Sequence, residues 1–114
     1  MLNYNKIAII DDGVNMGFYN NISKLNDSIE IDINCKIIEY KSNSRGYSHG
    51  TTCASIINKY TENSMISSVK VINESGKTTG KQLINAIKWC LQNEFGIVNL
   101  SLGSTDINEK KIYI

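Results

Sequence analysis

Two side chains that act together in acid–base chemistry stand near the ends of apolar segments in this chain. Asp11 directly follows the apolar run 7–10 and is followed by Asp12 and Gly13. His49, the only histidine, opens an apolar-periodic segment. A carboxylate can hold one ring nitrogen of a histidine while the other nitrogen accepts the proton of a nucleophile. The two residues therefore predict two-thirds of a Ser-His-Asp catalytic arrangement, with Asp11 as its acid and His49 as its base.

Each of these residues also has a simpler interpretation. Asp-Gly is ordinary turn chemistry, so Asp11 or Asp12 alone would be expected to cap or terminate an element. A lone histidine after a polar stretch is more often a surface residue. Gly13 allows a sharp turn after a strand, and Gly50 allows a helix to pack closely on a sheet. These surroundings favour the catalytic interpretation of His49.

The segments that must position these residues alternate between strand and helix patterns. Apolar runs and period-two alternation predict four strands, over 6–10, 29–40 (broken near Asn34), 66–72 and 97–102. Apolar stripes at helical spacing predict three helices, over 18–27, 49–60 and 80–95. The alternation predicts an α/β fold of three layers, α/β/α, with a parallel sheet of about four strands.

The helix expected over 80–95 carries signals at both ends. Thr79 and Gln82 have the spacing of a capping box, and Gly96 stands where a helix-ending glycine belongs. Functional groups of parallel sheets gather at the carboxyl ends of the strands. Asp11 lies at such an end, and the helix that begins near His49 is expected to bring the imidazole to it.

Length, charge and cysteine content exclude several functional classes. The 114 residues fit one domain, and a net charge of +1 offers no field that would attract nucleic acid or a membrane surface. No window approaches the twenty apolar residues of a membrane span, and no signal peptide is evident, so a cytoplasmic location is expected. Three cysteines argue against a disulfide framework. No spacing among them and the histidine suggests a zinc site, so no metal is predicted.

Three motifs in a fixed order resemble the subtilisin-like serine proteases, the subtilases. They are the apolar-apolar-Asp-X-Gly pattern that ends at Gly13, the His-Gly-Thr-X-Cys-Ala pattern of 49–54, and Ile-Val-Asn-Leu-Ser-Leu-Gly at 97–103. The resemblance covers about 6–103, most of the chain. Asp12 stands where many subtilases have Ser or Thr, although an acid also occurs there in the kexin and furin branch.

This resemblance implies roles for particular residues. Asp11 would be the triad aspartate and His49 the general base. The residues that would bind an extended peptide or protein substrate through main-chain hydrogen bonds are Leu100, Ser101, Leu102 and Gly103. Calcium sites are common in the family, but no acidic loop here identifies one, so no cofactor is assigned.

The chain departs from the family pattern in one large respect. Subtilases run in the order Asp, His, Ser, yet neither the Gly-Thr-Ser-Met-Ala motif of the serine nor the motif of the oxyanion asparagine occurs in 1–114. We therefore interpret 1–114 as a partial subtilase peptidase domain, expected to be inactive alone. Of the seven parallel strands that the resemblance implies, four would form a contiguous block in the order 29–40, 66–72, 6–10, 97–102. The bare edge at 97–102 predicts pairing with a complementary C-terminal subtilase piece, or self-association.

Other interpretations stay open beside this one. The chain could be a non-catalytic subtilase-like module that binds peptides or proteins, or an excised portion of a longer enzyme. A receiver-type signalling domain also has a first strand that ends in an acidic pair. That class needs an aspartate after its third strand, and no aspartate lies between Asp32 and Asp106, which makes this alternative remote.

Overall fold

The computed structural model describes residues 1–19, 21–22, 24–42, 45–61 and 63–100. Within this part of the chain it has five strands and two helices. In chain order they are β1 (Asn3–Asp11), β2 (Ser28–Ile31), β3 (Ile37–Glu39), α1 (His49–Tyr60), β4 (Met65–Lys70), α2 (Gly80–Gln92) and β5 (Phe95–Leu100). Neither helix has the length and apolar character needed to cross a bilayer.

The strands form one sheet in the order β3-β2-β4-β1-β5. The strands β2, β4, β1 and β5 run parallel, and they occupy the order expected from the sequence. Ile10 of β1 lies opposite Val69 on one side and Leu100 on the other. Consequently the carboxyl end of β1, where Asp11 lies, is flanked by the ends of β4 and β5.

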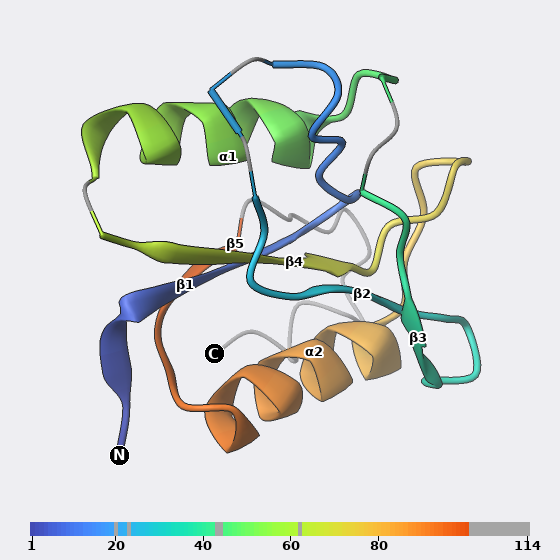
Figure 1. Ribbon diagram of the computed structural model, residues 1–114. Helices are drawn as coiled ribbons and strands as arrows, with labels where there is room; N and C mark the ends of the chain where they lie inside the picture. The colour runs from blue at the N-terminus through green and yellow to red at the C-terminus, as the bar shows by residue number, and fades with distance from the viewer. Residues whose placement is uncertain (20, 23, 43–44, 62, 101–114) are drawn as a thin grey trace.

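The sheet is covered on both faces, as the three-layer prediction requires. Figure 1 shows α1 over one face and α2 over the other. Ala8 and Ile10 pack in a buried cluster with Ala86 of α2, whereas Ile9 packs in a second cluster with Ala54 of α1. Alternate residues of β1 thus supply the two halves of the core, because successive strand side chains point to opposite faces.

The sheet is mixed rather than wholly parallel. The segment expected as a strand over 29–40, broken near Asn34, is a hairpin in which β3 runs antiparallel to β2. The reversal is made by Asp32, whose carboxylate accepts hydrogen bonds from the backbone N–H groups of Asn34 and Lys36, and by Cys35, whose φ is 62°. Apolar alternation continued through this turn, so it could not reveal the change of direction.

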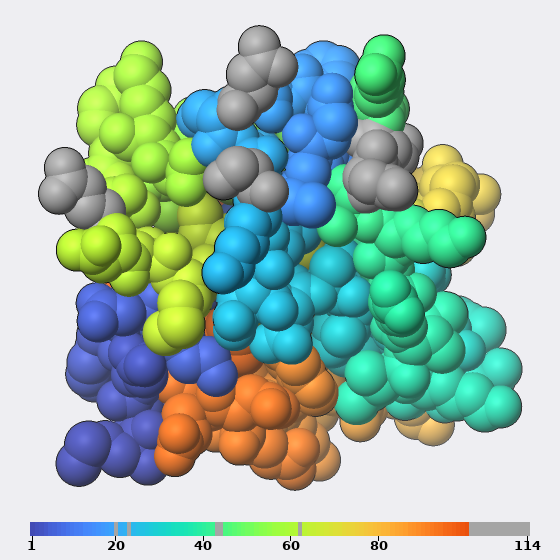
Figure 2. All heavy atoms as spheres, in the orientation of Figure 1, coloured from blue at the N-terminus to red at the C-terminus, as the bar shows by residue number. Residues whose placement is uncertain are grey.

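The helix expected over 18–27 does not form, since none of the described residues of that segment is helical. The Asn21 side chain donates to the Ser55 carbonyl and accepts from the Ser55 hydroxyl, both on α1. Asparagine side chains that bond elsewhere in this way compete with local helix formation. Ile22 is still buried against the α1-side core, and Figure 2 shows the light-blue segment before β2 seated between α1 and the β2–β3 hairpin.

The helix predicted over 80–95 begins where expected but ends earlier than expected. The Thr79 hydroxyl accepts from the Gln82 backbone, and the Gln82 side chain accepts from the Thr79 backbone, which is the expected capping box. The helix ends at Gln92, and Glu94, with φ 65°, makes the turn. Gly96 lies inside β5, where a Cβ would come within 2.7 Å of the Asn3 carbonyl oxygen on β1. Close approach of two strands, rather than helix termination, requires that glycine.

The N-terminus of α1 touches the end of β1 through two glycines. A Cβ at Gly50 would lie 2.5 Å from the carbonyl oxygen of Gly13 and 3.2 Å from Cβ of Asp11. Gly13 itself has φ 101°, a conformation that suits glycine. The separation of the helix start from the strand end is therefore set by the absence of a side chain at Gly50.

We predict that Gly50→Ala lowers the free energy of unfolding by about 1–3 kcal/mol, because the new methyl group overlaps backbone that cannot move freely. Alanine is intrinsically better than glycine in a helix by about 1 kcal/mol, so a net loss would show that the contact outweighs propensity. Urea denaturation measures the change. Ile56→Ala, at an exposed position of α1, is the matched control and should shift stability by no more than about 0.5 kcal/mol. A Gly50→Ala protein as stable as the wild type would refute the packing argument.

Candidate active site

Asp11 is the last residue of β1, and its side chain is almost completely buried at 3% exposure. Its carbonyl oxygen accepts hydrogen bonds from the backbone of Val71 and Ile72, just after β4. Its Oδ1 accepts from the backbone N–H of Asp12 at 2.8 Å. These bonds fix both the backbone and the plane of the carboxylate, and they leave Oδ2 for another partner.

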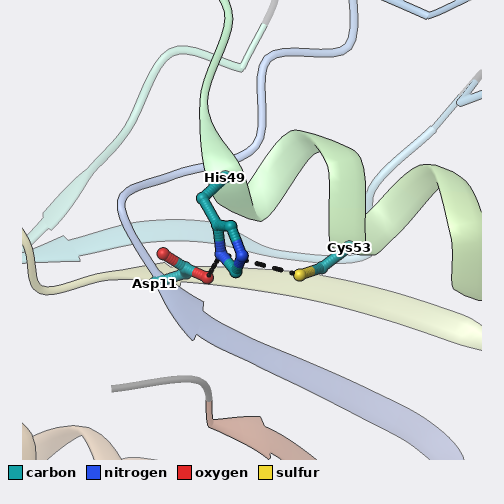
Figure 3. Close-up of side chains that lie close together, drawn as sticks. All are labelled: Asp11, His49 and Cys53. Atoms are coloured by element: carbon teal, nitrogen blue, oxygen red, sulfur yellow. Dashed lines mark hydrogen bonds and ion pairs between the residues drawn. The ribbon is translucent and has the colours of Figure 1, made fainter. Parts of the chain in front are cut away.

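That partner is His49, the first residue of α1. Nδ1 of the imidazole lies 2.7 Å from Oδ2 of Asp11, and the side chain is 54% exposed (Figure 3). The structure thus brings together the two residues that the sequence analysis selected. Because an ionised carboxylate can only accept hydrogen bonds, Nδ1 carries the proton and Nε2 of the neutral ring holds a lone pair.

Burial and hydrogen bonding act on this pair in different ways. Removal from water raises the pKa of Asp11, while the hydrogen bond from His49 works in the opposite direction. The hydrogen bond to Asp11, and then the charge of that carboxylate, raise the pKa of His49 above its ordinary 6.5. The arrangement therefore favours an imidazole that can take up a proton and stay attached to its carboxylate.

The backbone of His49 is held by a second carboxylate. Asp12 Oδ2 accepts from the His49 N–H at 3.1 Å, and Asp12 Oδ1 accepts from the Gly50 N–H at 2.8 Å. The N-cap residue Ser48 accepts from the Thr51 N–H and donates to the Gly13 carbonyl. Three of the N–H groups that begin α1 are thereby satisfied, with a negative charge at the positive end of the helix dipole. Asp12 does act as a cap, but on a helix that begins 37 residues later.

Cys53 is the third side chain at this place, and the sequence analysis gave it no role in the site. Its Sγ lies 3.7 Å from Nδ1 of His49 (Figure 3). Residues four apart lie on the same face of a helix, and that spacing was the signal that could have shown the contact. The thiol is partly buried and packs at the border of the α1-side core.

The expected substrate strand is described only in part. Leu100 ends β5 opposite Ile10 and is 40% exposed, so it lies beside the strand end that carries Asp11. Ser101, Leu102 and Gly103 lie outside the described residues. Their part in binding a substrate stays a prediction.

Comparison with known proteins agrees with this geometry. A family profile described as the subtilase family matches residues 4–112. The chain belongs to the subtilase family. A cold-adapted subtilisin-like serine proteinase of known crystal structure superposes with a TM-score of 0.62 at 24% identity, which shows the shared fold. The match covers 98% of this subtilase chain but 43% of that proteinase, so the chain spans less than half of its length. No curated protein matched the chain.

We predict that the pKa of His49 lies above 6.5 in the wild type and falls back toward that value in Asp11→Asn, because the neutral amide removes the negative acceptor. NMR titration can follow the ring without assignment, since the chain has one histidine. The sign for stability follows from the raised pKa: the stabilisation is complete below 6.5 and is lost as pH rises through the folded-state value. The control Glu39→Gln changes an exposed carboxylate on β3 and should leave the titration unchanged. Equal pKa values in wild type and Asp11→Asn would refute the pairing.

We also predict that Asp12→Ala destabilises the protein by about 1 kcal/mol, the usual cost of removing a helix cap. Asp12→Asn retains one carbonyl oxygen as acceptor and should lose less. Urea denaturation of both variants gives the order wild type, Asn, Ala. If the alanine variant were as stable as the wild type, the capping role assigned to Asp12 would be wrong.

Proposed function

We propose that this chain supplies the acid and the base of a serine endopeptidase that hydrolyses peptide bonds through an Asp-His-Ser triad. The observation that carries the proposal is the 2.7 Å contact between His49 Nδ1 and the buried Asp11 carboxylate in a chain of the subtilase family. The exposed part of the imidazole then faces outward, toward a nucleophile and substrate.

The chemistry assigned to the pair is proton transfer. Nε2 of His49 takes the hydroxyl proton of a serine as the serine oxygen attacks the peptide carbonyl carbon, and it later gives that proton to the leaving amine. Asp11 keeps the ring oriented through Nδ1 and stabilises the imidazolium formed in between. The acyl-enzyme that results is hydrolysed by water with the same base.

The serine must come from residues other than these 114, which contain no Gly-Thr-Ser-Met-Ala motif. In subtilisin, loss of the serine lowers turnover about a millionfold. Loss of one oxyanion-hole donor costs on the order of a hundred- to a thousandfold. A polypeptide of these 114 residues is therefore proposed to be inactive alone, and peptide binding without cleavage is its alternative function.

The outer strand β5 supports the proposal that a further subtilase segment completes the sheet. Among the described residues, β5 has a strand neighbour on one side only. Ile97, Val98 and Leu100 along it are 38–45% exposed, although they are apolar. A parallel strand added there would cover them and satisfy the open backbone groups. Self-association through the same edge is the competing proposal, which light scattering of the purified chain can distinguish.

We predict that the 114-residue polypeptide does not cleave a fluorogenic peptide. A fusion of this chain to the part of the cold-adapted proteinase that follows the matched region should cleave it. In that fusion His49→Ala should lower kcat about a millionfold and Asp11→Ala about ten-thousandfold. Glu39→Gln, on the distant edge strand β3, is the matched control and should keep full activity. Turnover by the 114 residues alone that a serine-directed inhibitor blocks, or a folded fusion indifferent to His49→Ala, would contradict the proposal.

A further inference from the structure

Three metal-ligating side chains converge at the end of β1. A carboxylate oxygen of Asp11, a ring nitrogen of His49 and the sulfur of Cys53 all lie within 4.8 Å of one another. We propose that these three side chains form a binding site for a zinc ion. The carboxylate, imidazole and thiolate are the ligand types that zinc takes in proteins, and three protein ligands leave a fourth position for water.

Two of the three ligand-atom separations come close to those of a zinc site, and the third, between Sγ of Cys53 and the Asp11 carboxylate, lies within 4.8 Å. Zinc binds sulfur at about 2.3 Å and nitrogen or oxygen at about 2.0–2.1 Å in a tetrahedron, which places its ligand atoms about 3.3–3.6 Å apart. The separation of Sγ from Nδ1 is 3.7 Å, close to that range. Nδ1 and Oδ2 of Asp11 are 2.7 Å apart and must separate by about 0.6 Å. His49 can make this adjustment because its side chain is half exposed.

The scaffold around the three ligands is well suited to hold an ion. His49 and Cys53 are four residues apart on α1, the spacing that puts two ligands on one helix face. Asp11 is held from the sheet by its own hydrogen bond from Asp12 N–H, which orients the carboxylate as outer-shell partners do in metal sites. Figure 3 shows the carboxylate and the thiol approaching the imidazole from different elements.

Zinc binding changes the protonation and the net charge of the site. The Cys53 thiol releases its proton to solvent, and the neutral imidazole transfers its ring proton from Nδ1 to Nε2 through solvent, which frees the Nδ1 lone pair for the ion. The carboxylate and the thiolate then neutralise the dication. The ion takes the place of the hydrogen bond between Asp11 and His49. Zinc would therefore disable His49 as the base and act as a reversible inhibitor. This inhibition rests on the proposed function, whereas the binding of zinc does not depend on it.

Cobalt(II), a spectroscopic substitute for zinc, gives the sharpest test on the 114-residue chain. We expect a thiolate-to-cobalt absorption band that appears at one equivalent and is displaced by zinc. Cys53→Ser should remove the band and weaken zinc binding in calorimetry by about tenfold or more, and Asp11→Asn should weaken it as well. Cys35→Ser is the matched control, because Cys35 packs against the core on the opposite face of the sheet; it should change nothing. Circular dichroism of each variant verifies that it is folded.

Three outcomes would overturn the inference: a wild-type chain without the band, a band that persists in Cys53→Ser, or a band that is lost in Cys35→Ser. The fused peptidase separates this inference from the proposed function. Zinc should lower kcat of the fusion, and Cys53→Ser should relieve that inhibition. If the fusion is inactive but the chain binds cobalt through Cys53, the zinc site stands and the proposed peptidase function is refuted. If the fusion is active but no thiolate-to-cobalt band appears, the peptidase function stands and the zinc site is refuted.

Discussion

The contact between the start of α1 and the end of β1 is the constraint on which the site depends. Gly50 lies so close to the Gly13 carbonyl that no side chain fits between them. At that separation the first residue of the helix places its imidazole on the Asp11 carboxylate, and the next carboxylate, Asp12, reaches the helix N–H groups. A side chain at the contact would move the helix away from the strand and weaken all three interactions together.

The same contact explains how a nearly buried carboxylate is tolerated at this position. Burial alone disfavours the charged form of Asp11, which raises its pKa. Hydrogen bonds from the Asp12 backbone and from His49 offset that cost, because a buried charge needs partners that donate to it. The outcome is a buried carboxylate beside a half-exposed imidazole, in which one ring nitrogen is bonded to that carboxylate.

Much of this arrangement could be predicted from the sequence because local patterns and tertiary packing agree there. The apolar runs at β1 and β4 and the capping box of α2 are local signals that survive in the fold. The break near Asn34 was expected, but the antiparallel direction of β3 was missed, because the apolar alternation continues through the turn that Asp32 stabilises. The segment around Asn21 has helical spacing, but its polar side chain bonds to α1 instead.

The candidate site, too, could be predicted from the sequence only in part. Asp11 and His49 could be selected because their motifs are specific and occur in a fixed order. The position of Cys53 beside the imidazole follows from the helical repeat, but its significance depends on the carboxylate that β1 brings from 42 residues earlier. The capping of α1 by Asp12 could not be predicted either, because it is a contact between distant parts of the chain.

The central claim is that His49 directs Nδ1–H at Asp11 and keeps Nε2 free to accept a proton. Nitrogen-15 NMR of the single histidine, recorded above its pKa, identifies which ring nitrogen carries the proton. We expect the Nδ1–H tautomer, with its proton shifted downfield by the carboxylate. A neutral ring protonated at Nε2 would contradict the claim, because that nitrogen could no longer serve as the base.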